Sequence, residues 1–244
     1  MKQNIYDDEV FFEGYRKLRE NPNSANNIIE KPAIFSLLPD LRGKSVVDLG
    51  CGYGENCKAF VSMGADKVVG IDISQKMLEV AKSENASGNI SYKNMCLENI
   101  SDIGERFDVA ISSLAVHYVE DFIKLAKDVY DLLNPTGVFI FSQEHPFTTA
   151  PLAGAGWIKD PNGRTECYRL SDYSVSGIRN VAWIVDNVVK YHRTFSDIIN
   201  WLIAAGFHIK NVVEPVASRE TIEKLPGYAN NLHKPDFLIV EAGK

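Results

Sequence analysis

The sequence predicts an α/β fold with a parallel β-sheet and crossover helices. Short β-rich runs alternate with segments of helical periodicity from Lys44 onward, and five such β units follow one another within about a hundred residues. A chain of 244 residues is longer than a typical domain, so we expect one domain with an added lobe. Its 45% hydrophobic and 24% charged residues are typical of a soluble globular protein and exclude collagen-like and largely disordered chains.

Five strands are expected in the first part of this pattern. The first is apolar until its aspartate, as in a central strand that is covered on both faces. Gly64 is placed to end the helix after this strand, and Ser74 is suited to begin the helix after the second strand. After the fourth strand, apolar residues keep the i, i+3, i+4, i+7 spacing of an amphipathic helix. The expected strands are residues 45–50, 67–72, 90–95, 107–113 and 138–142.

The alternation stops after the fifth strand and returns near the end of the chain. Residues 143–193 contain Pro, Gly and scattered aromatics, with one alternating stretch around 181–191, and are interpreted as an insertion or substrate lid. Thr194 begins a possible capping box, and the helix that follows it is expected to stop at Gly206. Two closing strands, HIKNVVEP and DFLIVEA, complete the pattern.

The N-terminal region precedes the first strand and has a different character. Residues 1–40 are expected to form one or two helices, broken around Asn21-Pro22 and Pro32. We interpret them as a helical flap on a main domain that spans residues 41–244.

Charge and composition exclude several classes of function. The 26 Lys and Arg residues against 32 Asp and Glu residues give a net charge of -6, which disfavours nucleic-acid binding and adhesion to a membrane. No apolar run is long enough to span a bilayer, and the acidic N-terminus lacks the apolar region of a signal peptide, so a cytoplasmic protein is expected. The four cysteines have no zinc spacing, and no metal site is expected.

A glycine-rich loop with a distant aspartate carries the chemistry. The first strand runs into Asp48, Gly50, Gly52 and Gly54, and a helix begins at once. Glycines let this turn approach a ligand closely, while the free amides of the helix N-terminus face the same place. Asp72 ends the second strand, where its carboxylate can accept hydrogen bonds from both hydroxyls of a ribose. The spacing is GxGxG rather than GxGxxG, which disfavours NAD as the ligand.

Four motifs between residue 44 and about residue 142 now point to a family. They are VVDLGCGYG, GIDISQKMLEVAK, FDVAISSLAVHYVED and LLNPTGVFIFS. In the order and spacing of these motifs, the chain resembles the class I S-adenosylmethionine-dependent methyltransferases with a VLDLGCGxG signature. The last helix and the two closing strands resemble the same family more loosely. The resemblance implies a Rossmann-like seven-stranded sheet whose last two strands form a reversed hairpin.

The resemblance also implies a site for S-adenosylmethionine. Gly50 and Gly52 would lie under its methionine part, and Asp72 would hold its ribose. Ser112 and Ser113 would line the methyl region. Leu97 would present a backbone amide to the adenine, whereas Cys96 departs from the pattern because an acid that accepts from the adenine amino group is common there; Glu98 could substitute. The residues implied to bind the cofactor are Asp48, Gly50, Gly52, Asp72, Ile73, Met77, Cys96, Leu97, Ser112 and Ser113.

Two polar pairs are candidates for the acceptor site. Glu144 and His145 follow the fifth strand at the carboxyl edge, where a histidine can act as a base or donate a hydrogen bond, or have no role. His192 has the same alternatives, and Arg193 could bind a carboxylate or phosphate. Aromatic residues could wall the pocket or serve in packing, with Tyr15 as the candidate for substrate binding. They are Tyr6, Phe11, Phe12, Tyr15, Trp157, Tyr168 and Tyr173. His117, after the fourth strand, is not included among the catalytic residues.

These observations predict an enzyme that methylates a small molecule by in-line displacement. The methyl group is already activated on a sulfonium, so alignment and exclusion of water matter more than a protein nucleophile. Two alternatives remain open: an NAD(P)-dependent oxidoreductase with an atypical glycine loop, and a non-catalytic cofactor-binding protein. The acceptor and the oligomeric state stay undetermined at this point.

Overall fold

A seven-stranded mixed sheet forms the centre of the computed structural model, which describes residues 3–153 and 156–244. Residues 1–2 of the expected flap and 154–155 of the expected insertion lie outside the described residues. The strand order is β10-β11-β5-β4-β1-β2-β3, and β11 runs antiparallel to both of its neighbours. The α/β fold and the reversed C-terminal hairpin are therefore confirmed. The strands of the sheet are β1 (Ser45–Leu49), β2 (Lys67–Asp72), β3 (Ile90–Asn94), β4 (Phe107–Ser113), β5 (Leu133–Glu144), β10 (His208–Val213) and β11 (Phe237–Gly243).

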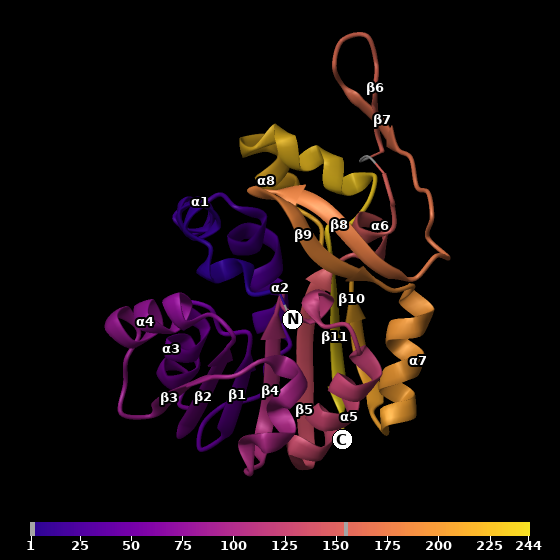
Figure 1. Cartoon of the computed structure of the whole chain (residues 1–244). Helices are drawn as coiled ribbons and strands as arrows, with labels where there is room; N and C mark the ends of the chain where they lie inside the picture. Colours follow the sequence, from indigo (N-terminus) through magenta and orange to yellow (C-terminus); the bar gives the residue numbers. More distant parts are fainter. Residues whose placement is uncertain (1–2, 154–155) are drawn as a thin grey trace.

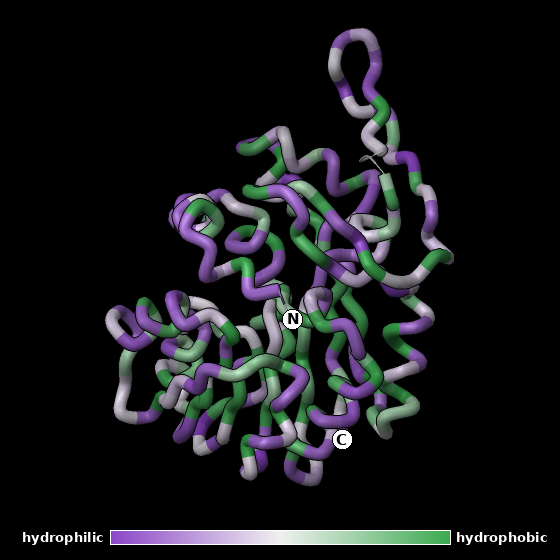
Figure 2. The backbone as a smooth tube through the Cα atoms, in the orientation of Figure 1, coloured by the Kyte–Doolittle hydropathy of each residue, from purple (hydrophilic) through white to green (hydrophobic). Residues whose placement is uncertain are grey.

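Helices cover both faces of this sheet (Figure 1). Neighbouring residues of one strand point to opposite faces, so Val46 packs in one apolar cluster and Val47 in the other. Figure 2 shows the resulting concentration of hydrophobic residues in the central strands. One face carries α5, α7 and the short helix η3, and the other carries α2, α3 and α4. These elements are α2 (Lys31–Ser36), α3 (Glu55–Ser62), α4 (Gln75–Glu84), η3 (Leu97–Ile103), α5 (Phe122–Leu132) and α7 (Phe195–Ala205).

Helices begin and end at the capping residues that the sequence predicts. The Ser74 hydroxyl accepts a hydrogen bond from the Met77 amide, which begins α4. Thr194 and Asp197 form a complete capping box at the start of α7, and Gly206 ends that helix in the left-handed conformation. Gly64 has a φ of 96° just after α3. The capping predictions are thus confirmed.

The N-terminal segment contains more helix than expected. Its elements are η1 (Ile5–Asp7), α1 (Glu9–Arg19), the π-helix η2 (Asn26–Glu30) and α2. The break at Asn21-Pro22 is present, but the break expected at Pro32 is not, because Pro32 is the second residue of α2. A proline is tolerated there because the first-turn amides have no partner within the helix.

The region after β5 is more regular than its sequence indicates. It contains α6 (Pro146–Thr149) and two hairpins, β6 (Trp157–Lys159) with β7 (Thr165–Tyr168), and β8 (Gly177–Trp183) with β9 (Val185–His192). The single alternating stretch expected around 181–191 is in fact a turn and parts of two strands, which meet at Ile184 with a φ of 57°. The β6–β7 hairpin projects from the body, whereas β8–β9 lies across one end of the sheet (Figure 1).

Two short helices between the last two strands have no counterpart in the sequence-based expectation. They are α8 (Arg219–Lys224) and η5 (Pro226–Leu232), and η4 (Val116–Tyr118) is a further short helix after β4. In Figure 1, α8 lies at the same end of the sheet as β8–β9.

Candidate active site

A cavity of about 660 Å³ lies at the carboxyl ends of the parallel strands. The ends of β1, β2, β4 and β5 contribute to its floor, as is usual for ligand sites in open α/β sheets. The N-terminal segment and the β8–β9 hairpin contribute to its walls, together with η3, the segment after β4 and Phe237. The cavity therefore joins the glycine loop to the two regions that the sequence predicts as a flap and as an insertion or substrate lid.

The glycine loop forms the floor beside β1. Gly50 and Gly52 have φ values of 82° and 53°, in the left-handed region that favours glycine. A Cβ at Gly50 would lie 2.4 Å from the Cβ of Ala115, so any larger residue would clash. A Cβ at Gly52 would meet no described atom within 4 Å, and it would enter the cavity space. The loop thus leaves its backbone open to a ligand.

Asp72 is fixed at the edge of this loop. Its Oδ2 accepts a hydrogen bond from the Gly52 amide at 2.8 Å, and its Oδ1 accepts one from the Ser74 amide at 2.9 Å. Burial raises the pKa of this carboxyl above its ordinary value, although these amides lower it. The carboxylate lines the cavity in a preset orientation, which suits a pair of vicinal hydroxyls.

The structure brings most of the expected cofactor residues to the cavity wall. The expected residues that line it are Gly50, Gly52, Asp72, Ile73, Met77, Cys96, Leu97 and Ser113. Asp48 and Ser112 are not among the described lining residues. Asp48 lies below the loop and is 1% exposed. Its Oδ2 accepts a hydrogen bond from the Cys57 thiol at 3.4 Å, and burial raises the pKa of its carboxyl to about 7. The Ser112 hydroxyl donates to the Leu49 carbonyl oxygen at 2.7 Å and so joins β4 to β1.

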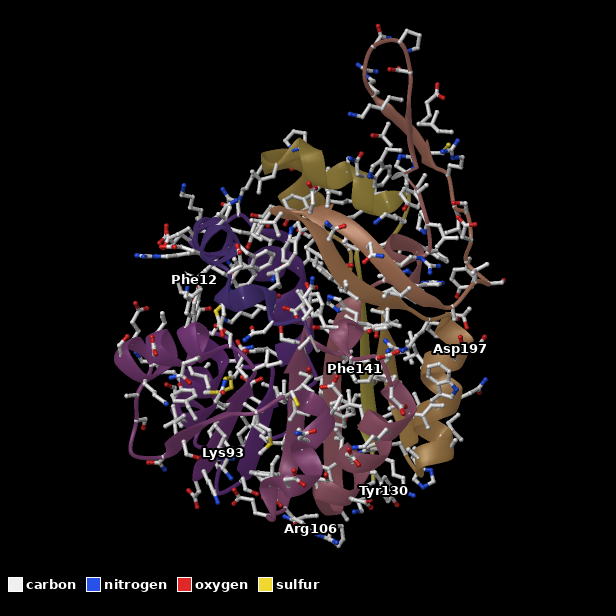
Figure 3. The ribbon with its side chains drawn as sticks, viewed as in Figure 1. Phe12, Lys93, Arg106, Tyr130, Phe141 and Asp197 are labelled. Carbon is white, nitrogen blue, oxygen red and sulfur yellow. The ribbon has the colours of Figure 1, made fainter. Side chains whose placement is uncertain are left out.

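The N-terminal segment is fastened to residues 73–76, beside Asp72 in the cavity wall. Asp7 accepts hydrogen bonds from the Ser74 hydroxyl at 2.6 Å and from the Lys76 amide at 3.2 Å. The Asn4 side chain donates to the Ile73 carbonyl oxygen at 3.3 Å. On α1, Phe12 faces α4 (Figure 3) and its ring contacts Tyr53. The first helix is therefore part of the site and not a separate appendage.

Arg19 is a cavity residue that the sequence reasoning missed. It lies at the end of α1, lines the cavity with the glycine loop, and donates to Glu55 at 2.6 Å. Its side chain is 22% exposed, so its charge is only partly solvated. The only sequence signal for this role was a positive charge in the last turn of α1. A positive charge there is equally explained by its favourable interaction with the helix dipole.

The two polar pairs expected at the acceptor site do not meet in the cavity. Glu144 lines it, but His145, His192 and Arg193 are not among the described lining residues. The His145 ring accepts from the Phe147 amide at 3.1 Å and pairs with Glu214 at 2.8 Å. We therefore withdraw the catalytic role expected for His145, because its ring serves as the cap of α6.

His192 and Arg193 are also held in structural contacts. The His192 ring bridges the Thr149 hydroxyl and the Tyr173 carbonyl oxygen, each at 2.8 Å. The Arg193 guanidinium donates to the carbonyl oxygens of Val119 and Glu120 and lies 5.3 Å from the centre of the Phe122 ring. Burial lowers the pKa of Arg193 to about 10. We withdraw their expected roles in catalysis and anion binding, because neither side chain reaches the cavity.

Glu144 and its partner Lys190 connect the sheet to the hairpin above it. Their charged atoms are 2.6 Å apart, and the Lys190 ammonium lies 4.9 Å from the centre of the Trp183 ring. Burial raises the pKa of Glu144, but the protonated form of His117, and the charge and hydrogen bond of Lys190, lower this pKa below its usual value. Glu144 is therefore a carboxylate at neutral pH, and its partner holds it there.

His117 and several aromatic side chains complete this end of the cavity. His117 is 3% exposed, and its Nδ1 has no hydrogen-bond partner within the described part of the chain. Burial lowers its pKa to about 4, so the imidazole is neutral at neutral pH. The phenol oxygens of Tyr6 and Tyr118 are 3.5 Å apart, and burial raises both pKa values. All of these residues line the cavity.

Among the aromatic residues considered from the sequence, Tyr6 and Tyr15 line the cavity. Phe11 is buried beside them, and Trp157 packs against Tyr168 in the projecting hairpin. Tyr118 and Trp183 are lining residues that the sequence reasoning missed. Tyr118 lies in the short helix η4 after β4, which is a usable positional signal, whereas Trp183 lies in a hairpin that was not recognised.

Residues 3–153 and 156–244 contain neither a membrane span nor a metal-binding cluster. No helix there is long and apolar enough to cross a membrane. In the same residues, no group of three or more His, Cys, Asp and Glu side chains is arranged to hold a metal ion.

Comparisons with known proteins converge on one family. A methyltransferase domain model matches residues 46–137. The solved structure of an S-adenosylmethionine dependent methyltransferase from Mesorhizobium loti is 37% identical with a TM-score of 0.81, and the match covers 93% of this chain and 100% of that one. An uncharacterized protein from Haemophilus influenzae is 41% identical over 253 residues, which cover 100% of this chain and 98% of that protein. A ubiquinone biosynthesis O-methyltransferase from Azorhizobium caulinodans is 35% identical over 109 residues, 44% of this chain and 42% of that enzyme.

Proposed function

We propose that this chain, which belongs to the class I S-adenosylmethionine-dependent methyltransferases, methylates a small organic molecule held inside its cavity. One observation carries the proposal: the cavity continues from the glycine loop and Asp72 into a chamber lined by the chain's own first helix and β8–β9 hairpin. Such a chamber suits a small acceptor better than a protein or nucleic acid, which needs an open surface. The methyltransferase relatives support this reading over the oxidoreductase alternative.

The cofactor would occupy the part of the cavity beside β1 and β2. Its ribose hydroxyls would donate to Asp72, and its methionine part would lie on the open backbone of Gly50 and Gly52. Ile73 and Met77 would pack against the adenine, with Cys96 and Leu97 at its edge and Ser113 near the methyl group. Bound S-adenosylmethionine supplies an electrophilic methyl group on a positively charged sulfur.

Arg19 would add a charge contact to the cofactor. The carboxylate of its methionine part needs a partner near the glycine loop, and Arg19 is the one Lys or Arg side chain among the lining residues that the structure describes. Its existing bond to Glu55 orients the guanidinium, which has further donors to offer.

Two regions would enclose the reaction. We propose residues 1–40 as a flap over the cofactor, since Asn4 and Asp7 hold this segment against residues 73–76. We propose residues 143–193 as the acceptor lid, since β8 and β9 contribute Ile178, Trp183, Val189 and Tyr191 to the cavity wall. By excluding water and aligning the acceptor, these regions would promote in-line displacement.

Labelled methyl transfer tests this function directly. The protein would be incubated with S-adenosylmethionine carrying a deuterated methyl group and a cell extract separated into small molecules, proteins and nucleic acids. We expect label in the small-molecule fraction, with loss of the signal in an Asp72→Ala variant. Label confined to the protein or nucleic-acid fraction would contradict the proposal, and cofactor binding without any transfer would favour the non-catalytic alternative.

A further inference from the structure

A buried carboxylate lies behind the cavity wall at the carboxyl end of β4. Glu30 is the last residue of the π-helix η2 and is 2% exposed. Its Oε1 accepts hydrogen bonds from the hydroxyls of Ser113, at 2.8 Å, and Ser142. These two serines are register partners on the neighbouring strands β4 and β5, and Ser113 also lines the cavity. Ser113 therefore links the Glu30 carboxylate to the cavity.

Glu30 has no ion-pair partner in the part of the chain that the structure describes. The positive charges of Arg19 and Lys31 lower its pKa, but both side chains pair with Glu55, at 2.6 and 3.9 Å. Burial acts in the opposite direction and raises the pKa of Glu30 above its ordinary value. A buried carboxylate that is held only by hydroxyl donors costs free energy. A positive charge supplied by a ligand would reduce that cost.

The other buried carboxylate of the cavity wall shows what Glu30 lacks. Glu144 ends β5, and the Lys190 ammonium lies 2.6 Å from its carboxylate. The chain thus neutralises the charge of Glu144 with its own side chain. At Glu30 the comparable position beside Ser113 is left to whatever occupies the cavity.

The proposed function brings one positive charge to this position. Ser113 belongs to the part of the wall that is proposed to lie near the methyl group, which S-adenosylmethionine carries on a positively charged sulfur. The product S-adenosylhomocysteine has the same adenosine and amino-acid groups, but its sulfur is neutral. A carboxylate behind Ser113 would therefore distinguish substrate from product by charge.

We propose that Glu30 is a specificity-determining residue whose carboxylate makes the site favour the positively charged cofactor over its neutral product. This assignment rests on the proposed function and adds to it a means of limiting inhibition by S-adenosylhomocysteine. Glu30 acts through space and through the Ser113 hydroxyl, so it needs no direct contact with the ligand.

Binding of three matched ligands tests the assignment without turnover. Calorimetry would measure the Kd of S-adenosylmethionine, of S-adenosylhomocysteine, and of sinefungin, in which an ammonium-bearing carbon replaces the methylsulfonium. Glu30→Gln removes the charge but keeps an oxygen that can accept from both serines. We expect the variant to bind the two ligands with this extra positive charge about tenfold more weakly, and to change the Kd of S-adenosylhomocysteine less than about twofold.

Two control variants separate the effect of charge from that of structure. Ser142→Ala disturbs the same hydrogen bonds but leaves the carboxylate, so it should change the three Kd values alike. Glu84→Gln removes an equal charge from an exposed position outside the cavity wall, and it should change none of them. A change in the ratio of the Kd values that is confined to Glu30→Gln therefore supports the proposal.

Several outcomes would overturn it. Equal weakening of all three ligands in Glu30→Gln would place the charge against the ammonium of the methionine part, which they share, and unchanged Kd values would give Glu30 no role in binding. The empty variant should be at least as stable to denaturant as the wild type, since an unpaired buried charge is gone. Failure of both Glu30→Gln and the similarly sized Glu30→Met to fold would show that the fold itself requires this carboxylate. A wild type that binds none of the three ligands would instead contradict the proposed function, so the two failures are distinguishable.

Discussion

The two ends of the cavity are built in different ways. The end beside β1 and β2 uses backbone amides and one carboxylate, and its main parts come from a continuous stretch of chain between Gly50 and Leu97. The end near His117 uses side chains, which come from the first helix, the β4 and β5 ends and the β8–β9 hairpin. Backbone geometry recognises one fixed ligand, whereas side chains on separate segments can change independently. We expect perturbations at the first end to change cofactor binding and those at the second to change stability and acceptor choice.

The largest expected effect is at the first end. Asp72→Ala removes the proposed acceptor of two ribose hydrogen bonds, each worth roughly 1.5 kcal/mol or more, so the cofactor Kd should rise at least about a hundredfold. Asp48→Asn is the matched control, because that carboxyl lies below the loop and burial raises its pKa to about 7. Calorimetric titration with S-adenosylhomocysteine should find the control within about threefold of wild type. A similar loss of cofactor affinity in both variants would contradict a specific role of Asp72, because it would show that any change near the glycine loop weakens binding.

A smaller effect is expected where the second end is tied to the sheet. Lys190→Met leaves the Glu144 carboxylate without its partner and should lower the free energy of unfolding by about 3 kcal/mol. The double variant with Glu144→Gln should recover much of this loss, since neither charge is then buried alone. Lys93→Met breaks a more exposed pair with Glu105 and should cost less than about 1 kcal/mol in the same denaturant titration. Equal losses in the two single variants would refute the distinction.

Acid should destabilise the second end through His117. Its pKa is about 4 in the folded protein, against 6.5 for an ordinary histidine, because burial and the charges of Lys190 and Arg193 outweigh the effect of Glu144. The unfolded chain therefore takes up a proton below about pH 6.5 and the folded chain does not, so stability falls as the pH is lowered. This one group should remove about 2 kcal/mol between roughly pH 7.5 and pH 5.

His117→Phe isolates this contribution from those of other titrating groups. As the pH falls from roughly 7.5 to 5, the wild type should lose about 2 kcal/mol more of its unfolding free energy than the variant does. Parallel stability curves for the two proteins would show that the imidazole is not held neutral by its surroundings.

The smallest effect is expected for Arg19. Arg19→Gln should raise the cofactor Kd about fivefold, or about 1 kcal/mol, because a charged hydrogen bond is lost while Gln can still donate. Arg16→Gln is the control, since that side chain is 59% exposed and pairs with Glu20 along the same helix. Stopped-flow binding would show whether the loss lies in the dissociation rate, and identical values for both variants would remove Arg19 from the site.

Local sequence signals account for what could be predicted. Asp72 ends a strand with a clear apolar pattern, and Thr194 begins a capping box within four residues, so nearby residues determine both features. Contacts at the other end of the cavity join residues far apart in the chain. The meeting of Glu144 with Lys190 depends on how β8–β9 folds back over the sheet, and no residue within either segment encodes that arrangement by itself.

Strand parity explains why Glu144 reaches the cavity while its neighbour His145, also a candidate, does not. The sequence indicated a fifth strand that ends at residue 142, but β5 continues to Glu144. Along an extended strand, successive side chains point in opposite directions, so Glu144 faces the cavity and His145 faces Glu214. Because the expected end of this strand was two residues too early, the sequence did not show which of Glu144 and His145 faces the cavity.

The bonds from Asn4 and Asp7 to the residues beside Asp72 bear on the timing of each turnover. In the proposed flap, these contacts would retain a cofactor enclosed between the two parts of the chain. Each cycle would then begin and end with the same few hydrogen bonds breaking and re-forming, and we expect the release of spent cofactor to be the slow step. The pace of the enzyme would then be set by a short stretch at the start of the chain that takes no part in moving the methyl group.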